Sequence, residues 1–355
     1  MFEPKRIVFV IPDLKGNGAE RVVLTLAKGV RALGHRVHIV CFKADFEFDT
    51  DGLDIHIFRM QLWRWVPRSI RGHLVRLLLD RFIMRVSEGI PNLVLSNLLP
   101  CDRILSKSRL PNVHLIVHNT LSLDQRVAHA RAETRLYQEK PVICVSDGVR
   151  ADLLRMFPTR AGQSMTIHNP VEREWLMRAA SEVSLQTALP NRYIVHVGKF
   201  KSEKRHDLLL KAFANADTTY DLVLLGQGPL MAGAQKLAQT LGIASRVHFL
   251  GFQTNPFPIV KNAALLTLCS DFEGLGMVLL EAIALGVPVI STDCPSGPNE
   301  ILLPHQLTPV GDVHALAKQL SAPDFNVFKV ALDEKFDLSY AIKRYLALAD
   351  SRVGA

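Results

Sequence analysis

The chain has 355 residues, of which 48% are hydrophobic and 21% charged, and its formal net charge is +8. This length predicts two domains, and the composition excludes a disordered or fibrous chain. Five scattered cysteines without metal-ligand spacing favour a reducing compartment over a disulfide framework. No apolar stretch approaches the roughly 20 residues that span a bilayer, so we expect a cytosolic protein or one bound to a membrane surface.

The first half predicts strands that alternate with helices. Acid and proline precede a short apolar run at 6–12, RIVFVIP, which predicts a buried first strand and not a signal peptide. A glycine-bearing loop, a helical pattern over 21–35 and the strand RVHIVCF follow. Further candidate strands are IHIF, NLVLSN, HLIVHN and PVICVS, and SDGVRADLLRMF predicts a helix capped by Ser146 or Asp147.

An arginine-rich segment lies between Arg59 and Val86, with Asp80 as its single acid. Apolar side chains are interleaved with the arginines: Trp63, Trp65, Ile70, Leu74, Leu77, Leu78 and Phe82. Arginine and tryptophan on an amphipathic segment suit an interface with anionic lipid headgroups. A solvated helix face and a nucleic-acid site are the alternatives. We expect an anionic membrane surface as the partner, and no nucleic acid.

The second half repeats the alternation after an irregular segment at 172–190. Its candidate strands are YIVHVGKF, DLVLLG, RVHFLG, ALLTLCS and VPVIST, with helical patterns between them. The fold class is therefore α/β, with two doubly wound, Rossmann-like parallel sheets facing a central cleft. We expect domains at 1–171 and 191–335, the linker between them, and a C-terminal helix at 336–355 that crosses back to the first domain. Ligands of such sheets bind outside the carboxyl ends of the strands.

The stretch DFEGLGMVLLEAIALG at 271–286 contains the most informative pattern. Glu281 lies among apolar residues, where burial of a carboxylate is costly unless it is hydrogen-bonded or paired. Glu273 precedes the helix, and Gly274 and Gly276 let the backbone N–H groups and the helix dipole bind a phosphate. The carboxylates lie on the order of 10 Å apart, which matches the distance from the sugar of a nucleotide sugar to its ribose. A salt bridge for Glu281 and a cap for Glu273 are the alternatives.

Positive charge for a diphosphate follows the first strand of the second half. Lys199 and Lys204 flank a loop in GKFKSEKRHDLL and are candidates for a charge-assisted clamp. Arg205 is a third candidate, or a solvated loop charge. Gly228 opens another helix and is a candidate to line the nucleotide. Phe252 is a candidate contact for the base, or a core residue.

Together these motifs resemble retaining glycosyltransferases of family GT4, which have the GT-B fold. The resemblance rests on Glu273 and Glu281 with Gly274-Leu275-Gly276 between them, on the lysine pair, and on DCPSGPNE at 293–300, and it extends over nearly the whole chain. It implies that Glu281 binds ribose and Glu273 the transferred sugar, while the backbone of Gly274, Leu275 and Gly276 contacts sugar and phosphate.

The same resemblance implies that Lys199 and Lys204 hold the diphosphate and stabilise the leaving group. The family commonly has arginine at the first of these positions, and lysine keeps the charge but loses the bidentate fork. Similar proteins often read SGPRE where this chain has Asn299, so we assign that residue no role.

Two residues of the first half also match the family. Gly18, in the loop GNGAE, matches a glycine that faces the donor phosphates, and His118 matches a histidine close to the reacting sugar. A structural role is the alternative for His118. As a dinucleotide motif the glycine loop fails, because Arg21 occupies the sixth position and no acid ends the next strand. An NAD-dependent dehydrogenase is thereby disfavoured.

The resemblance implies a hexosyltransferase-type enzyme that uses a nucleotide-diphosphate donor. We expect a UDP-sugar, with a preference for N-acetylhexosamine, a lipopolysaccharide or lipid-linked glycan as acceptor, and retention of configuration. We expect no metal or other cofactor, since diphosphate is a good leaving group and lysines supply the charge. The expected location is the cytoplasm, peripheral on the cytoplasmic face of a bacterial inner membrane. A non-catalytic sugar-nucleotide-binding protein and a GT-B epimerase are the alternatives.

Overall fold

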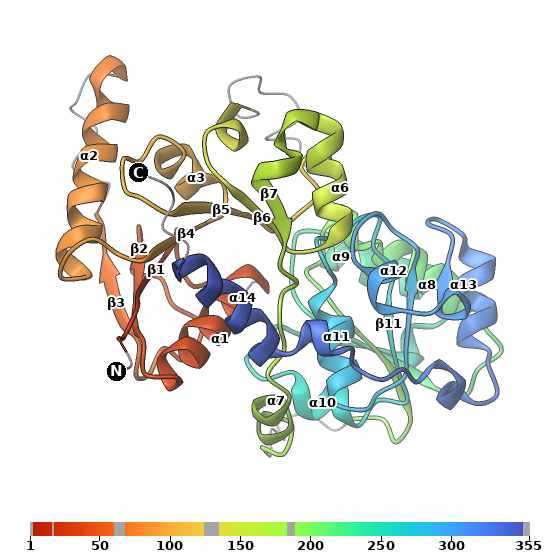
Figure 1. The fold of residues 1–355 in the computed structure, drawn as a ribbon. Helices are drawn as coiled ribbons and strands as arrows, with labels where there is room; N and C mark the ends of the chain where they lie inside the picture. Colours follow the sequence, from red (N-terminus) through yellow and green to blue (C-terminus); the bar gives the residue numbers. More distant parts are fainter. Residues whose placement is uncertain (1–2, 16–17, 60–67, 124–134, 183–188, 351–355) are drawn as a thin grey trace. The chain divides into compact units, whose positions relative to one another are not determined.

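The computed structural model describes residues 3–15, 18–59, 68–123, 135–182 and 189–350 (Figure 1). The chain forms two compact units. The first comprises Met1–Pro170 together with Lys335–Ala355, and the second comprises Val171–Glu334. Each unit has its own parallel sheet, as expected for a doubly wound α/β chain.

The first unit is built on a seven-stranded parallel sheet with the strand order β3-β2-β1-β4-β5-β6-β7. Its central strands are buried along their whole length, which explains their continuous apolar sequences. The strands are β1 (Arg6–Ile11), β2 (Arg36–Cys41), β3 (Asp54–Ile57), β4 (Leu93–Asn97), β5 (Val113–Val117), β6 (Val142–Cys144) and β7 (Ser164–Thr166).

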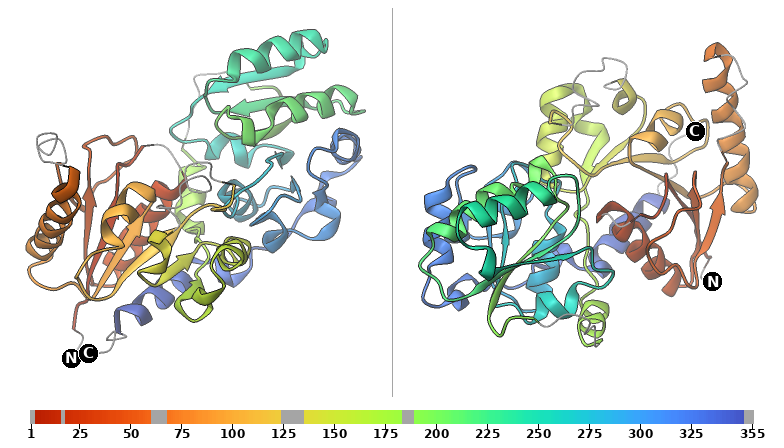
Figure 2. Two further views of the ribbon diagram at one scale, coloured as in Figure 1. Left: turned by 90° about the horizontal axis from the view of Figure 1, so that it is seen from above. Right: turned by 180° about the vertical axis from the view of Figure 1, so that it is seen from behind.

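Helices cover this sheet: α1 (Gly18–Ala32), α2 (Arg68–Val86), α3 (Leu99–Leu105), α6 (Asp147–Met156) and α14 (Leu338–Asp350). Ser146 is the N-cap of α6, and its hydroxyl accepts from the Val149 N–H at 3.1 Å. The C-terminal helix α14 lies beside α1 (Figures 1 and 2). Gly29 permits this close packing, since a Cβ there would lie 2.6 Å from Cδ1 of Ile342 and that side chain would have to shift. Chain ends distant in sequence therefore share one unit.

The second unit has a six-stranded parallel sheet with the order β10-β9-β8-β11-β12-β13. The strands are β8 (Tyr193–Val197), β9 (Asp221–Leu225), β10 (Val247–Gly251), β11 (Leu265–Leu268), β12 (Val289–Thr292) and β13 (Leu307–Thr308). The helices are α7 (Arg173–Ala179), α8 (His206–Asn215), α9 (Met231–Thr240), α10 (Phe257–Lys261), α11 (Met277–Ala284), α12 (Pro298–Ile301) and α13 (Val313–Leu320). Leucine, phenylalanine and alanine side chains of these strands and helices form its core.

The segment at 172–190 differs from the irregular linker expected from its sequence. Residues Arg173–Ala179 form α7 and belong to the second unit. Leu176 and Ala179 are buried, and the Trp175 ring packs edge-on against the Phe257 ring with 5.4 Å between centroids. The prediction missed this helix because its apolar face is short and interrupted by charged residues, so that tertiary packing stabilises it.

Apart from Arg59, helix α2 contains the described part of the arginine-rich segment. Val75, Leu79 and Ile83 are buried at a spacing of four residues, whereas Arg81 and Arg85 are exposed. The predicted contacts of Trp63 and Trp65, and of the Ile70 side chain, lie outside what the structure describes. None of the described helices, α2 included, has both the length and the apolarity needed to cross a bilayer.

Candidate active site

The predicted site residues of the second unit follow neighbouring strands. Lys199 and Lys204 come after β8, Gly228 after β9 and Glu273 after β11. The sheet order places β9, β8 and β11 side by side, and parallel strands end at the same edge of a sheet. The topology therefore brings these residues to one edge, although they span about a fifth of the chain.

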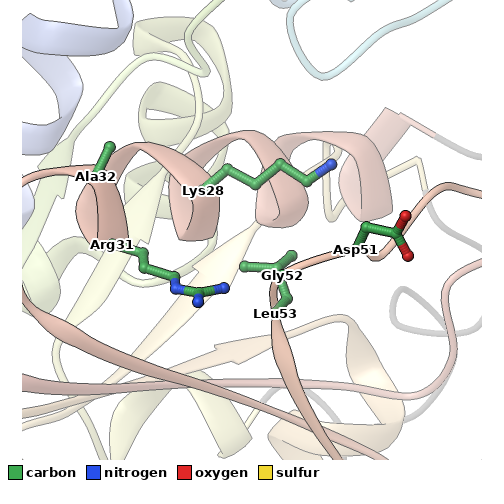
Figure 3. A pocket seen from close by; sticks show the side chains of 6 residues that line it. All are labelled: Lys28, Arg31, Ala32, Asp51, Gly52 and Leu53. Atoms are coloured by element: carbon green, nitrogen blue, oxygen red, sulfur yellow. The ribbon is translucent and has the colours of Figure 1, made fainter.

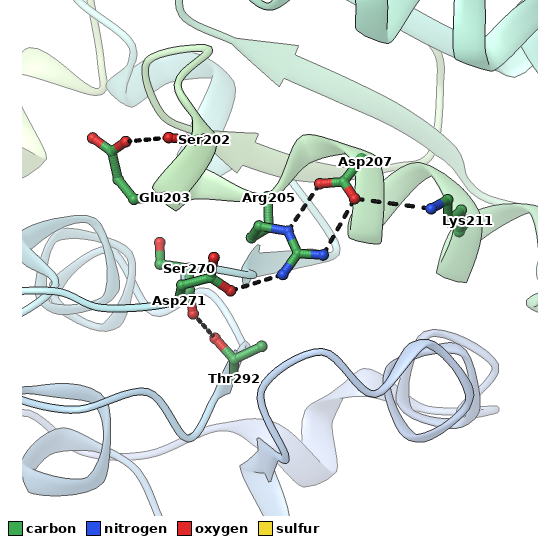
Figure 4. A network of polar contacts seen from close by, with 8 residues as sticks. All are labelled: Ser202, Glu203, Arg205, Asp207, Lys211, Ser270, Asp271 and Thr292. Atoms are coloured by element: carbon green, nitrogen blue, oxygen red, sulfur yellow. Dashed lines mark hydrogen bonds and ion pairs between the residues drawn. The ribbon is translucent and has the colours of Figure 1, made fainter.

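Lys204 and Glu273 are in direct contact. Lys204 ends the short 3₁₀ helix η4 (Ser202–Lys204), and its Nζ lies 2.5 Å from Oε1 of Glu273. The Ser270 hydroxyl donates to the same oxygen at 2.6 Å. The Ser270 carbonyl in turn accepts from the Thr292 hydroxyl at 2.7 Å (Figure 4). The carboxylate is thus held by a cation and a hydroxyl. An anionic ligand of Lys204 has to share or displace this ion pair.

Two glycines near Glu273 are required by the backbone conformation and packing of the loops. Gly276 is the N-cap of α11 with φ 86°, a left-handed conformation that is strained for residues with a Cβ. Helix α11 accordingly begins at Met277. Gly297, in the loop after β12, packs so closely that a Cβ would lie 2.3 Å from the Leu275 carbonyl oxygen. The loops after β11 and β12 are therefore interlocked, and Gly276 supplies no side chain to cap the first N–H groups of α11.

Glu281 lies in the middle of α11, and it is 8% exposed. Its neighbours Leu280 and Ala282 are fully buried, as the apolar sequence around it predicts. A carboxylate at this depth requires a polar partner. Its assignment to a ribose stays a prediction, as do the ligand contacts of Lys199, Gly274 and Leu275.

Arg205 ties two loops together and is not a solvated loop charge. Its Nε lies 3.0 Å from Oδ1 of Asp207, and its Nη1 lies 2.9 Å from Oδ1 of Asp271, two residues before Glu273 (Figure 4). These two carboxylates raise the pKa of the guanidinium. The residue has φ 47°, a conformation that costs a side-chain-bearing residue about 1 kcal/mol. The ion pairs offset this strain and hold the loop after β8 against the loop after β11.

Gly228 and Phe252 lie at the ends of β9 and β10. A Cβ on Gly228 would lie 2.6 Å from the Phe200 carbonyl oxygen, so this glycine permits backbone packing between two loops, whatever its role toward a ligand. Phe252 is 38% exposed, which excludes the alternative that it is a core residue. Its contact with a base stays a prediction.

Sequence reasoning missed two buried histidines beside the lysine loop. His196 donates from Nδ1 to the Thr267 carbonyl at 2.9 Å, and its ring lies 4.7 Å from the His206 ring, which stacks on Phe200. Burial lowers the pKa of His196 to about 4 and that of His206 to about 2. Both rings are thus neutral at neutral pH and add no positive charge next to Lys204. The one available signal was a histidine within the apolar strand YIVHV.

In the first unit, His118 follows β5, and Gly18 is the exposed first residue of α1, after β1. The His118 Nε2 lies 3.0 Å from Oδ1 of Asn97, the last residue of β4. Because β1, β4 and β5 are neighbours, Gly18 and His118 belong to the carboxyl edge of this sheet. Asn97 was missed, although it ends the predicted strand NLVLSN.

A separate hollow of about 310 Å³ lies at the opposite end of the first sheet (Figure 3). It is lined by Lys28, Arg31, Ala32, Asp51, Gly52 and Leu53, from the end of α1 and the residues ahead of β3. The hollow therefore lies at the amino end of β3, away from the carboxyl edge of the sheet that holds Gly18 and His118. None of the predicted site residues lines this hollow.

Comparison with known proteins identifies the family. Residues 16–175 match the sequence model described as Glycosyltransferase Family 4, and residues 178–322 match that of Glycosyl transferases group 1. The chain is a GT4 glycosyltransferase. The expected enzyme class, a hexosyltransferase-type glycosyltransferase, is thereby confirmed.

Two relatives of this GT4 enzyme have named activities. It is 26% identical to the Campylobacter jejuni N-acetylgalactosamine-N,N'-diacetylbacillosaminyl-diphospho-undecaprenol 4-alpha-N-acetylgalactosaminyltransferase, over 84% of this chain and 83% of that one. It is 30% identical to the Salmonella typhimurium lipopolysaccharide 1,6-galactosyltransferase, over 46% of this chain and 45% of that one. The second match therefore covers less than half of either protein.

Solved structures confirm the GT-B fold of the GT4 enzyme. The Anabaena protein HepE in complex with UDP and glucose superposes with a TM-score of 0.79 at 20% identity, over 97% of this chain and 98% of that one. A glycosyltransferase from Rickettsia africae superposes with a TM-score of 0.78 at 15% identity, over 98% of both chains.

Proposed function

We propose that the enzyme transfers a sugar from a UDP-sugar to a lipopolysaccharide or lipid-linked glycan acceptor with retention of configuration. The contact of Lys204 with Glu273 at the carboxyl edge of the second sheet, next to the glycine-opened helix α11, is the observation that carries this proposal. It pairs a cation suited to a diphosphate with a carboxylate suited to sugar hydroxyls. The HepE structures, whose titles name UDP, glucose and UDP-glucose, support the choice of donor.

In this proposal the donor extends along α11. Glu281 accepts hydrogen bonds from the ribose, the N–H groups around Gly274 and Gly276 bind phosphate, and Lys199 and Lys204 neutralise the diphosphate. Lys204 then moves from Glu273 to the phosphate, which leaves the carboxylate to accept from a hydroxyl of the transferred sugar. Two ammonium groups and a helix N-terminus stabilise the leaving diphosphate without a metal ion.

We propose N-acetylhexosamine as the transferred sugar. The Campylobacter jejuni relative, which matches most of the chain, is named as an N-acetylgalactosaminyltransferase acting on a diphospho-undecaprenol acceptor. Galactose is the second candidate, because the Salmonella typhimurium relative is named as a galactosyltransferase of lipopolysaccharide.

Incubation of the purified protein with a panel of UDP-, GDP- and ADP-sugars tests the donor. Transfer to a lipid-linked glycan with release of UDP is expected with UDP-N-acetylhexosamines, at a higher rate than with UDP-galactose, and equally with EDTA present. Anomeric coupling in the product reports retention. Conversion of the donor without an acceptor would indicate an epimerase, and UDP binding without any reaction would indicate a non-catalytic binding protein.

We further propose that the exposed arginines of α2 bind an anionic membrane surface, on the cytoplasmic face of the inner membrane. Arg81 and Arg85 lie on the exposed side of this helix, where each basic residue contributes about 1 kcal/mol near an anionic surface. Binding to anionic vesicles is expected to exceed binding to neutral vesicles and to weaken with salt. Equal binding to both kinds of vesicle at moderate salt would contradict the proposal.

A further inference from the structure

Asn97 is a buried amide at the carboxyl end of β4. Its side chain is fully buried, and β4 pairs with β5 so that Asn97 lies opposite Ile116, two residues before His118. The amide Nδ2 lies 3.1 Å from the Leu95 carbonyl oxygen and 3.4 Å from that of Val10. Both partners are backbone carbonyls, which only accept hydrogen bonds.

These contacts determine which way the amide faces. Because the carbonyls accept, the NH₂ group must point toward them, and the amide oxygen must point the other way. That oxygen lies 3.0 Å from Nε2 of His118. An amide oxygen has no hydrogen to donate, so the His118 Nε2 must carry the proton of this hydrogen bond.

The other ring nitrogen of His118 is then defined as well. Burial lowers the pKa of His118 to about 4, so the ring is neutral near pH 7 and carries a single proton. With that proton on Nε2, the Nδ1 atom has a lone pair. Nδ1 is buried and makes no hydrogen bond with any residue that the structure describes. A buried acceptor in this state costs about 1 to 3 kcal/mol until a donor reaches it.

We propose that Asn97 is a positioning residue that fixes His118 as the Nε2–H tautomer and presents Nδ1 to the substrate as a hydrogen-bond acceptor. The group that fits is a hydroxyl, which can donate to Nδ1 and has no charge to bury. His118 therefore orients a hydroxyl of the sugar substrate and does not deliver a proton to the leaving phosphate. The identity of that substrate rests on the proposed function, whereas the tautomer does not.

The tautomer is measured on the ligand-free full chain, labelled with ¹⁵N-histidine, by long-range ¹⁵N–¹H NMR at neutral pH. The His118 signal is assigned by its loss in His118→Gln. The expected result is one tautomer, with the proton on Nε2. A proton on Nδ1, a mixture of tautomers or a doubly protonated ring would overturn the proposal.

Two carboxylate variants test the role of Asn97. Asn97→Asp places a negative charge against Nε2 and is expected to raise the pKa of His118 by about one to three pH units. The control Asn119→Asp adds the same charge at an exposed position next to His118 and is expected to leave the tautomer unchanged, with a smaller pKa change. Equal effects of both variants would contradict positioning by Asn97. If Asn97→Asp fails to fold, the tautomer measured on the unmodified chain decides whether the proposal holds.

A titration with the most active sugar nucleotide tests the acceptor role. The Nδ1 signal of His118 is expected to shift as the hydroxyl donates to it, while Nε2 stays protonated. An unchanged Nδ1 signal with bound donor and acceptor would refute that role. If no sugar nucleotide reacts, the proposed function is wrong. The tautomer measurement does not depend on that result and tests the role of Asn97 separately.

Discussion

The predicted site residues of the two sheets are held by different kinds of contact. In the second unit the loops after β8 and β11 are joined by two ion pairs, Lys204 with Glu273 and Arg205 with Asp271. In the first unit the corresponding contact is between neutral groups, Asn97 and His118. Nearby Asp102 is also buried, which raises its pKa to about 7.

This difference matches the chemistry that each sheet would meet. A diphosphate carries negative charge and needs cations that are already in place, and carboxylates keep those cations positioned until the ligand arrives. In the first unit the proposed acceptor for a hydroxyl, Nδ1 of His118, is neutral and has a defined tautomer. Under these proposals the second unit supplies the cations for the diphosphate, and His118 of the first unit supplies a neutral acceptor for a hydroxyl.

The strongest test of the charged side is Glu273→Ala. Loss of a group that acts on the transferred sugar is expected to reduce kcat by about 100- to 1000-fold while UDP binding is kept. Transfer assays and calorimetric UDP titration measure the two effects. Glu203→Ala, in the facing loop, is the matched control and should retain activity. A kcat unchanged in Glu273→Ala would refute the site assignment.

Glu281→Gln tests the ribose assignment. Hydrogen bonds to a charged group contribute about 1.5 to 3 kcal/mol, so UDP affinity is expected to fall about 10- to 100-fold. Inorganic diphosphate, which has no ribose, serves as the control ligand. It should bind the unmodified protein and Glu281→Gln equally. Parallel losses for UDP and diphosphate would show that Glu281 acts elsewhere.

The neutral histidines of the second unit predict acid sensitivity. Above about pH 6.5 a histidine is neutral in both states; below it only the unfolded chain takes up the proton, because the folded pKa of His196 is about 4 and that of His206 about 2. Each ring thus lowers the free energy of unfolding by about 1.4 kcal/mol per pH unit as the pH falls from 6.5 toward 4.

His206→Phe keeps the stack on Phe200 and removes one of these protonations. Hydrogen exchange of β8 measures the free energy of unfolding at pH 7 and at pH 5. Between these pH values it is expected to fall by about 2 kcal/mol more in the unmodified chain than in the variant. The same pH dependence in both proteins would mean that His206 is protonated in the folded state.

The smallest predicted effect concerns Arg205. Both Arg205→Ala and Arg205→Gly remove the ion pairs, but only glycine adopts φ 47° without strain. The free energy of unfolding of Arg205→Gly, measured by urea denaturation, is therefore expected to be about 1 kcal/mol higher than that of Arg205→Ala. Equal stability would indicate that the loop relaxes when the guanidinium is removed.

Several features of the protein could be predicted from its sequence. Apolar runs and helical patterns predicted the alternation of strands and helices, because these periodicities are local. A carboxylate within an apolar helix marked Glu281, and lysines directly after a strand marked Lys199 and Lys204. The family resemblance connected these residues, and the family and the fold are confirmed, while the ligand roles of the residues remain predictions.

Other features depended on the tertiary structure. The sequence determined which residues follow each strand, but the strand order β9-β8-β11-β12 decided that Lys204 meets Glu273 across 69 residues. The tie by Arg205, the packing of α7 and the pairing of Asn97 with His118 are likewise long-range contacts. Local periodicity specifies elements and their faces, whereas these contacts arise only when the sheet brings distant loop ends to the same edge.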